Sequence, residues 1–254
     1  MQQRHDGRRV IVTGAGSGIG QGIVLRMLAE GARVVAADIV EAGLKETVAA
    51  AGDHADRLST VVVDISDETS VAAALTAARE YLGGLDVLVN AAGIMKTART
   101  HEMSLADWNR IIGINLTGTF LMIRESLPTL LESETPVIVN FSSTSAFLSH
   151  PYMAAYSATK GGINAMTHSL ALEYVKQGLR AVNIVPGGIT SGITTQLDVP
   201  ENADWDLFSR LSGRLNGGAL GTPADIAGVV AMVASEDGKY MTGTELRVDG
   251  GALM

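Results

Sequence analysis

The sequence of 254 residues contains no cysteine, which excludes disulfides, thiolate metal sites and redox-active thiols. No apolar stretch approaches the roughly 18 unbroken residues that a membrane span needs. Residues 1–9 are polar and basic, and no apolar signal-peptide region follows them. The five histidines lack the paired spacing that is typical of zinc sites. We therefore expect a cytoplasmic protein with no metal and no membrane partner.

Basic charge is also scarce. The chain has 19 Lys and Arg residues against 27 Asp and Glu residues, a formal net charge of −8, and its longest basic cluster is Arg8–Arg9. Such a balance does not favour nucleic acid, so no nucleic-acid partner is expected. Glycine, in contrast, is abundant: there are 29 glycines, and they gather where predicted strands end. The hydrophobic share of 46% is enough to bury a full core.

Short, almost continuously apolar runs alternate with stretches of helical periodicity along the whole chain. Such runs are typical of parallel strands that are covered on both faces. The predicted strands are Arg9–Thr13, Arg33–Ala37, Ser59–Val63, Val87–Asn90, Val137–Ser142, Arg180–Val185 and Glu245–Val248. The clearest predicted helices are Gly20–Glu30, Thr69–Leu82 and Ala158–Lys176.

No linker, low-complexity tract or internal repeat divides this alternation. The predicted fold class is therefore α/β, with one doubly wound (Rossmann) domain over residues 1–254. Its parallel sheet has seven strands and helices on both faces, in three αβα layers.

The segment Gly188–Asn216 is the longest departure from this pattern. Long excursions inside compact domains are usually functional or mobile. We predict a lid at about residues 188–216, over a ligand at the carboxyl edge of the sheet. The apolar residues available to it are Ile193, Leu197, Val199, Trp205, Leu207, Phe208 and Leu211.

A glycine-rich loop, Thr13-Gly14-Ala15-Gly16-Ser17-Gly18-Ile19-Gly20, follows the first predicted strand and opens directly into a helix. Glycine lets the backbone approach a pyrophosphate, and a helix N-terminus offers free N–H groups. The alternative is a turn of no special purpose, but the strand before it and the helix after it favour a dinucleotide site. The loop lacks the Gly-Lys-Ser/Thr ending of an ATP or GTP site. The predicted cofactor contacts are Gly14, Ser17, Gly18, Ile19 and Gly20.

Asp38 ends the second predicted strand, eighteen residues beyond Gly20. A carboxylate there accepts hydrogen bonds from both hydroxyls of an adenosine ribose, and it repels an additional ribose phosphate. We therefore expect NAD(H) to be preferred over NADP(H). A solvated carboxylate at a strand end is the alternative interpretation.

Tyr156 and Lys160 are four residues apart on a predicted helix, so they share a face. Free tyrosine has a pKa of about 10. A nearby ammonium, together with the positive ring of NAD⁺, is expected to lower it. Tyr156 can then take a proton from an alcohol or give one to a carbonyl. Tyr152 is the weaker candidate, because the residue four positions after it is not a lysine. Ser143, at the end of the fifth strand, can hydrogen-bond the substrate oxygen.

These motifs, together with Asn90-Ala91-Ala92-Gly93, Asn115 and Pro186-Gly187, resemble the single-domain short-chain dehydrogenase/reductase family. The resemblance covers nearly the whole chain, and the motifs follow the order and spacing of the family. The family's spacing to Tyr156 selects Ser143 over its neighbour Ser142. The resemblance implies that Lys160 also holds the nicotinamide ribose, and that Asn115 organises a water that links Lys160 to solvent.

The resemblance implies further cofactor contacts, at Asp64, Ile65, Asn90, Ala91, Gly93, Pro186, Gly187, Ile189 and Ser191. Ser191 stands where the family usually has threonine; the hydroxyl is kept, so only the detailed geometry of amide binding is expected to differ. The resemblance also implies pairing of the helices around Trp108–Leu131 and Ala158–Lys176 across a two-fold axis. A homotetramer is therefore expected, with a dimer next.

The predicted activity is hydride transfer between nicotinamide and the carbon of a small, uncharged secondary alcohol or ketone. One alternative is a catalytically idle dinucleotide-binding protein, against which Ser143, Tyr156 and Lys160 argue. Another is reduction of a 3-oxoacyl thioester on acyl-carrier protein. An acidic carrier is expected to be repelled by the acidic residues of the insertion and by Glu132-Ser133-Glu134. That these acids are merely solvated remains open.

Overall fold

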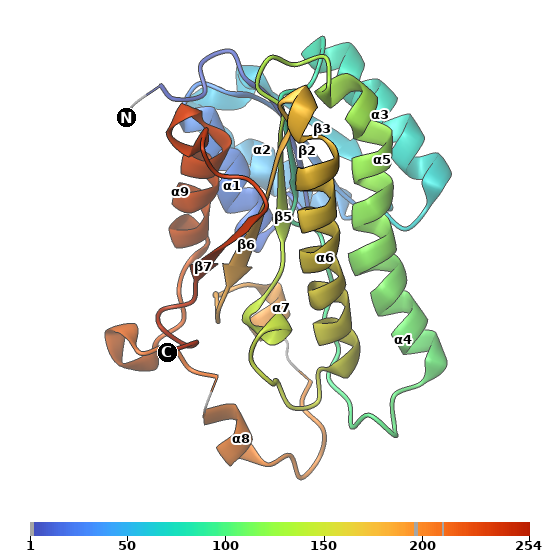
Figure 1. Cartoon of the computed structure of the whole chain (residues 1–254), viewed down its shortest axis with the longest axis vertical. Helices are drawn as coiled ribbons and strands as arrows, with labels where there is room; N and C mark the ends of the chain where they lie inside the picture. Colours follow the sequence, from blue (N-terminus) through green and yellow to red (C-terminus); the bar gives the residue numbers. More distant parts are fainter. Residues whose placement is uncertain (1–2, 196–197, 210) are drawn as a thin grey trace.

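A seven-stranded parallel sheet forms the centre of the molecule (Figure 1). The computed structural model describes residues 3–195, 198–209 and 211–254. The strand order is β3-β2-β1-β4-β5-β6-β7. The strands are β1 Arg9–Thr13, β2 Arg33–Asp38, β3 Leu58–Val62, β4 Val87–Asn90, β5 Val137–Phe141, β6 Arg180–Pro186 and β7 Thr244–Val248. All seven predicted strands are confirmed to within one residue at each end.

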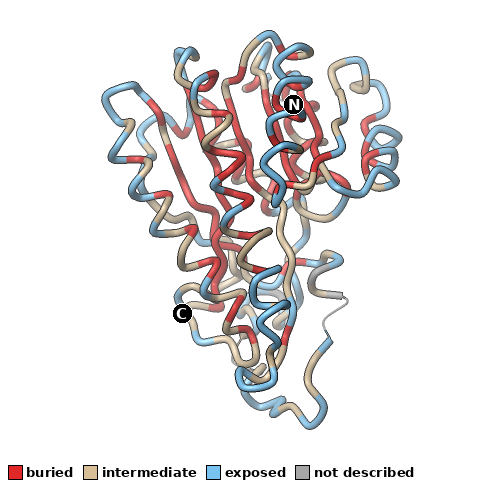
Figure 2. Tube along the Cα trace, turned by 90° about the vertical axis from the view of Figure 1, so that its right-hand side faces the viewer, coloured by how far each residue is buried: buried red, intermediate tan, exposed pale blue. Residues whose placement is uncertain are grey.

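Helices cover both faces of this sheet. On one face, α1 (Gly18–Ala29), α2 (Glu41–Ala51) and α9 (Pro223–Ala234) pack in one apolar cluster. On the other face, α3 (Glu68–Leu82), α5 (Thr119–Leu130) and α6 (Ala154–Glu173) pack in a second cluster. Figure 2 shows buried residues along the strands and exposed residues on the outer sides of the helices. The predicted doubly wound α/β fold is thus confirmed.

The pleat of the strands explains the two clusters. Successive side chains of a strand point to opposite faces of the sheet. Val10 and Val12 of β1 accordingly join the cluster of α1 and α9, whereas Ile11 joins the cluster of α3 and α5. Strand β1 pairs with β2 on one side and with β4 on the other. The strand order reverses there, and in such sheets ligands bind beyond the carboxyl ends at this point.

The helical stretch expected around Trp108–Leu131 is interrupted. Helix α4 (Leu105–Ile112) passes into a π-helical segment, η2 (Gly113–Gly118), before α5 begins at Thr119. Asn115 lies in this segment. Single π-turns inside helices are often found at functional sites. The elements of the predicted insertion are short: α7 (Gly192–Thr195), α8 (Trp205–Ser209) and the 3-10 turn η5 (Leu215–Gly218).

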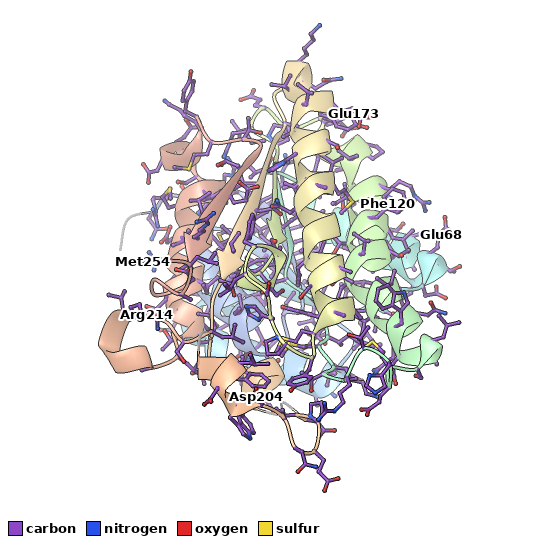
Figure 3. All side chains as sticks on the ribbon, turned by 60° about the horizontal axis from the view of Figure 1, so that its bottom comes forward. Glu68, Phe120, Glu173, Asp204, Arg214 and Met254 are labelled. Atoms are coloured by element: carbon purple, nitrogen blue, oxygen red, sulfur yellow. The ribbon has the colours of Figure 1, made fainter. Side chains whose placement is uncertain are left out.

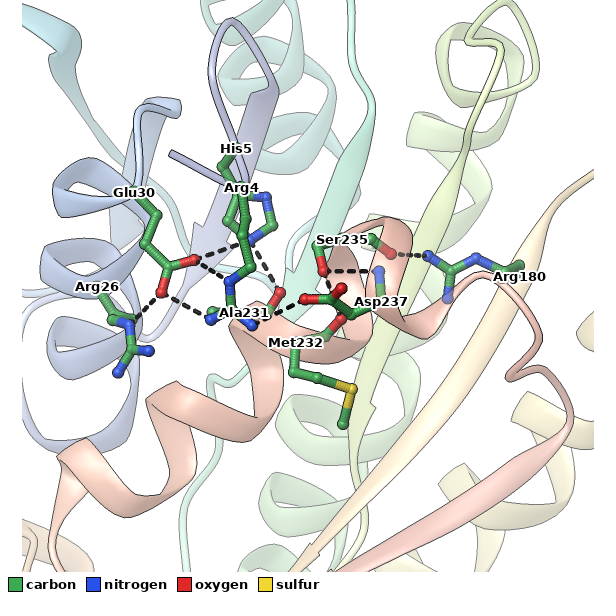
Figure 4. Close-up of polar contacts among 9 residues, drawn as sticks. All are labelled: Arg4, His5, Arg26, Glu30, Arg180, Ala231, Met232, Ser235 and Asp237. Atoms are coloured by element: carbon green, nitrogen blue, oxygen red, sulfur yellow. Dashed lines mark hydrogen bonds and ion pairs between the residues drawn. The ribbon is translucent and has the colours of Figure 1, made fainter. Parts of the chain in front are cut away.

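The N-terminal segment is fastened to α1 and α9 around a buried carboxylate (Figure 4). Glu30 is 1% exposed; Arg4 donates to both of its oxygens at 2.8 Å, and Arg26 pairs with it as well. The buried His5 donates from Nε2 to the carbonyl oxygen of Ala231 (2.9 Å). Burial by itself raises the pKa of Glu30, but the hydrogen bonds and charges of Arg4 and Arg26 outweigh it and keep the pKa below its usual range.

Within the described ranges, every helix is too short or too polar to traverse a lipid bilayer. The described His, Asp and Glu side chains also form no cluster of three that is placed to hold a metal ion.

Candidate active site

The glycine loop is too tightly folded for a side chain at Gly14 and Gly20. Gly14 has a φ of +66°, and a Cβ there would lie 2.8 Å from Cα of Ala92 at the end of β4. A Cβ on Gly20 would lie 2.1 Å from the carbonyl oxygen of Gly14. The exposed Ser17 precedes α1, which has no acidic residue in its first turn. A bare backbone and a helix N-terminus therefore face the same space, so these residues fit a dinucleotide pyrophosphate.

Asp38 is fixed at the tip of β2, beside this loop. Its Oδ2 accepts from Gly16 N and its Oδ1 from Val40 N, both at 2.9 Å. The side chain remains half-buried, and each carboxylate oxygen has a second lone pair to offer. The arrangement suits two hydroxyl donors of a ribose.

Tyr156 and Lys160 lie one turn apart in α6, and Lys160 Nζ is 5.5 Å from the centre of the Tyr156 ring. Lys160 Nζ donates to the carbonyl oxygen of Phe141 (2.8 Å) at the end of β5. Ser143 follows this strand and hydrogen-bonds with Tyr156. Its neighbour Ser142 instead donates to the backbone oxygen of Lys160 (3.1 Å). The structure thus brings Ser143, Tyr156 and Lys160 together and gives Ser142 a contact within the scaffold.

Burial dominates the ionisation of the pair. It raises the pKa of Tyr156 to about 12, against the opposing effect of the hydrogen bond with Ser143, and it lowers the pKa of Lys160 to about 8. The expected lowering of the Tyr156 pKa is therefore not found. The reason is that loss of water disfavours phenolate and ammonium alike. A positively charged nicotinamide ring beside the phenol acts against this effect of burial.

Asn115 joins the same cluster from the π-helical segment. It is fully buried; its Oδ1 accepts from Ile94 N and its Nδ2 donates to Ile94 O, both at 2.8 Å. A Cβ on Gly93 would lie 3.3 Å from Asn115 Oδ1 and 3.8 Å from Lys160 Nζ. Gly93, Asn115 and Lys160 are thus neighbours, and a side chain at position 93 would crowd the Asn115 amide.

Asn90 contributes its backbone to this edge, because its side chain is engaged elsewhere. Asn90, Asn140 and Asn183 are buried and in register across β4, β5 and β6. Asn90 Nδ2 donates to Asn140 Oδ1 (2.8 Å), and Thr167 of α6 hydrogen-bonds with both Asn140 and Asn183. This chain of amides holds α6 against the sheet. This chain of amides was not predicted from the sequence, although three asparagines inside apolar strand runs indicate it.

Asp64 and Ile65 lie just beyond β3. Asp64 Oδ1 accepts from Ser66 N (2.9 Å) and Ser66 Oγ (2.6 Å), which stiffens the turn. Ile65 is buried, and a Cβ on Gly118 would lie 2.8 Å from its Cγ1. The Ile65 side chain therefore packs against the π-helical segment. Only its backbone is available to a cofactor.

The loop after β6 lies over the glycine loop. A Cβ on Gly18 would lie 3.2 Å from Ser191 Cβ, so Ser191 stands above the start of α1. Pro186 is the last residue of β6, and a Cβ on Gly187 would meet Asp249 at 2.8 Å. Ile189 forms a parallel bridge with Gly221.

A cavity of about 680 Å³ opens beside Tyr156, under the insertion. Its walls include Ser143, Tyr156, Gly187 and Ile189, and the insertion adds Phe208, Leu211 and Leu215. The lining residues that were not predicted from the sequence include Met95, Thr144, His150 and Met153. Three of them lie between Ser143 and Tyr156, so closeness to the catalytic residues in the sequence was the available signal.

Contacts at several points fasten the insertion, and two groups of them lie beside α8 and at the C-terminal end of the insertion. Just before α8, Asp204 N donates to the Tyr152 hydroxyl (3.0 Å), and on α8 the ring of Phe208 stacks on that of Tyr152, with 5.8 Å between the ring centres. At the other end, Arg214 N and Leu215 N donate to Gly250 O (2.6 and 3.0 Å). Figure 3 shows Asp204 on the first of these parts and Arg214 near Met254 on the second. Leu197, one of the predicted lid residues, lies outside the described residues.

Tyr152 itself has a φ of +62°, which is uncommon for a residue other than glycine. Its carbonyl oxygen accepts from Ala98 N (2.9 Å). Tyr152 thus contacts both the insertion and the loop after β4. This explains its presence better than a catalytic role does.

The stretch Glu132-Ser133-Glu134 was expected to influence the approach of a carrier protein. In the fold it follows α5 and precedes β5, and Ser133 Oγ donates to Asp86 Oδ1 (2.7 Å) just before β4. Within one chain it therefore lies at the amino edge of the sheet, opposite the cavity. The expected repulsion of a carrier protein by these residues stays a prediction, because it depends on where a carrier docks.

Comparison with known proteins finds a family model and several dehydrogenases that match nearly the whole chain. Residues 14–252 match the sequence model of a family described as enoyl-(acyl carrier protein) reductase. The chain is 36% identical over 252 residues to 3beta-hydroxysteroid dehydrogenase 1 of Eggerthella lenta, with 98% of this chain and 94% of that protein covered. It is also 36% identical over 254 residues to 2,5-dichloro-2,5-cyclohexadiene-1,4-diol dehydrogenase LinX of Sphingobium indicum, with 99% and 98% covered.

Among solved structures, 3-ketoacyl-(acyl-carrier-protein) reductase from Brucella melitensis in complex with NADH is similar, with a TM-score of 0.88 and 33% identity. The match covers 98% of this chain and 99% of that one. The chain belongs to the short-chain dehydrogenase/reductase family. It is an oxidoreductase that uses a nicotinamide dinucleotide and acts between a secondary alcohol and a ketone.

Proposed function

We propose that this enzyme interconverts a small neutral secondary alcohol and its ketone with NAD(H) in preference to NADP(H). The observation that carries the proposal is the convergence of Ser143 and Tyr156 on the wall of the cavity, with Lys160 one turn from Tyr156 in α6 and 5.5 Å from its ring centre. Catalysis then depends on Asn115, Ser143, Tyr156 and Lys160.

The roles of the side chains follow from their contacts. The Tyr156 hydroxyl holds the proton that passes to or from the substrate oxygen, and Ser143 donates a hydrogen bond to that oxygen. Lys160 uses one N–H on Phe141 O, which leaves two for ribose hydroxyls. Asn115 holds the backbone of Ile94 beside Lys160. The nicotinamide, when bound, supplies or accepts the hydride.

The cofactor is expected to lie across the carboxyl edge of the sheet. Gly14, Ser17, Gly18, Ile19 and Gly20 hold its pyrophosphate, Asp38 its adenosine ribose, and Asp64 and Ile65 its adenine side. The nicotinamide side is held by Asn90, Ala91, Gly93, Tyr156, Lys160, Pro186, Gly187, Ile189 and Ser191. The preference for NAD(H) rests on the carboxylate of Asp38 beside Gly16.

The remaining parts of the proposal concern the whole chain. Residues 1–254 act as one domain in the cytoplasm, with residues 188–216 as a lid over the substrate. A homotetramer is supported by exposed apolar side chains on the outer side of α4, α5 and α6, namely Leu105, Trp108, Phe120 and Leu172. Light scattering at micromolar concentration tests it, and a monomer would contradict it.

A second candidate is reduction of a 3-oxoacyl thioester, which the similarity to an acyl-carrier-protein reductase favours. A panel of secondary alcohols and ketones, a 3-oxoacyl and a 2-enoyl thioester on acyl-carrier protein, read by NADH absorbance, separates the candidates. We expect free ketones to be the better substrates. A clearly higher kcat/KM on either carrier-linked thioester would overturn the proposal.

A further inference from the structure

The cavity contains a second polar pair, separate from the catalytic residues. Thr144 and His150 both line it, and His150 Nε2 lies 3.3 Å from Thr144 Oγ1. Thr144 is 4% exposed and directly follows Ser143. The wall also contains apolar side chains, among them Met95, Met153 and Phe208. When a ligand displaces water from this wall, the polar pair loses free energy unless the ligand offers it a hydrogen bond.

The pair offers a hydrogen-bond donor in either tautomer of the imidazole. If Thr144 donates to Nε2, the proton is on Nδ1, which is then a donor. If Nε2 donates to Thr144, the threonine hydroxyl is free to donate onward. Burial lowers the pKa of His150 to about 4, so the ring is neutral at physiological pH. A neutral donor of this kind suits an uncharged oxygen.

The other described polar groups of the cavity wall offer no free charged partner to a charged substrate. The described lining residues include neither lysine nor arginine. Asp225 Oδ2 accepts from Thr222 N and Oγ1, both at 2.7 Å. Asp249 accepts from Gly251 N and Leu253 N at 2.9 and 3.1 Å. Both carboxylates are thus committed to turns, and the described lining has no lysine or arginine to neutralise an anionic group.

From these contacts we infer that Thr144 and His150 bind a second, uncharged oxygen of the substrate, away from the reacting carbon. The inference rests on the proposed function and narrows it. The preferred substrates are diols, hydroxyketones or diones, rather than compounds with a single oxygen. His150 and Thr144 determine this specificity, and Ser143 and Tyr156 handle the reacting oxygen.

The alternative is that the pair only shapes the turn after Ser143. In this turn, Ala146 N donates to Ser143 O (3.0 Å) and Leu148 N to Thr144 O (2.7 Å). A purely structural role predicts that loss of His150 harms all substrates equally. A binding role predicts a loss confined to substrates with a second oxygen.

The test compares NADH-dependent reduction of cyclohexanone, 2-hydroxycyclohexanone and cyclohexane-1,4-dione. The enzyme should prefer at least one two-oxygen ketone about tenfold or more in kcat/KM, beyond the factor of about two that two equivalent carbonyls contribute, as a single hydrogen bond allows. In His150→Leu this ratio should fall to within about twofold of unity, with cyclohexanone nearly unaffected. His150→Gln should restore part of the ratio, and His101→Leu, at an exposed histidine, should leave it unchanged.

A wild-type ratio near unity for both probes, or an equal loss on all three ketones in His150→Leu, would overturn the inference. Binding of cyclohexane-1,4-dione to the NADH-loaded protein, followed by NADH fluorescence, separates this from failure of the proposed function. Binding that depends on His150 without any turnover would support the polar subsite and refute the proposed reaction. Binding that is indifferent to His150 would refute the subsite, whatever the turnover.

Discussion

At the scale of single residues, the chemistry depends on a phenol and an ammonium that are both removed from water. With a pKa of about 12, Tyr156 is a protonated donor at neutral pH. A lysine with a pKa of about 8 keeps most of its charge there, but it can lose it a little higher. With these pKa values, the site is suited to giving a proton to a carbonyl oxygen. Proton removal from an alcohol needs further positive charge nearby.

Tyr156→Phe should lower turnover by about 10²–10⁴-fold, because it removes the group that exchanges a proton with the substrate. NADH binding, measured by fluorescence titration, should stay within a few-fold of the wild type. Tyr81→Phe, at a tyrosine of α3 far from the cavity, is the matched control. Turnover of the Tyr156→Phe protein close to that of the control would remove Tyr156 from the mechanism.

Asp38→Ala should bring the kcat/KM values for NADH and NADPH closer together. The wild type is expected to favour NADH, because an additional phosphate on the ribose would meet the carboxylate. The loss should fall mainly on NADH, because its ribose hydroxyls lose the carboxylate acceptor, whereas the phosphate of NADPH no longer meets a like charge. Equal efficiency with both cofactors in the unmodified enzyme would show that Asp38 does not select between them.

The predictability of these residues from sequence was uneven. Residues in motifs, such as Tyr156 and Lys160, were found because helical spacing places them on one face. Thr144 and His150 were not, because their role depends on a cavity wall that also includes the insertion. The predicted direction of the Tyr156 pKa shift was wrong for the protein without its cofactor, because the spacing of residues does not reveal how far a site is removed from water.

At the scale of elements, the strands were easy to predict and the interruptions were not. Buried parallel strands give continuous apolar runs that begin and end sharply. The π-helical segment Gly113–Gly118, in contrast, has no pattern of its own. It is held by contacts distant in sequence, from Asn115 to Ile94 and from Gly118 to Ile65. The same holds for Tyr152, because its positive φ is explained only by its contacts with Asp204 and with Phe208 of α8.

Tyr152→Phe should raise KM for the ketone about two- to tenfold and leave kcat nearly unchanged. The change removes the hydrogen bond to Asp204 N and keeps the ring that stacks on Phe208, so the insertion is held less firmly over the cavity. Tyr240→Phe, at a fully exposed tyrosine, is the control. A fall in kcat with unchanged KM would instead place Tyr152 among the reacting groups.

At the scale of the whole molecule, the carboxyl edge and the amino edge of the sheet have different roles. The carboxyl edge carries the glycine loop, the catalytic residues and the insertion. The amino edge is closed by polar contacts, foremost those of Asp86, which lies just before β4. Asp86 accepts from Arg9 N (2.9 Å), Arg9 Nη2 (2.6 Å) and Ser133 Oγ (2.7 Å). One carboxylate thus joins the starts of β1, β4 and β5.

Asp86→Asn should lower the free energy of unfolding at pH 7 by about 2 kcal/mol. Burial raises the pKa of Asp86, but the hydrogen bonds from Arg9 and Ser133 outweigh this and lower it from 3.8 to about 2. A carboxyl whose pKa is lower in the folded state stabilises the fold above its unfolded pKa, and loses this effect as the pH falls through the folded pKa. The difference from the wild type should therefore be full above about pH 4 and vanish towards pH 2.

Urea unfolding of both proteins at several pH values measures this difference directly. Glu41→Gln is the matched control, because Glu41 pairs with Lys45 on the exposed side of α2 and an exposed pair contributes little. It should change the free energy of unfolding far less at every pH. If Asp86→Asn lost as much stability at pH 2.5 as at pH 7, the effect would come from packing at the amino edge and not from the charge of Asp86.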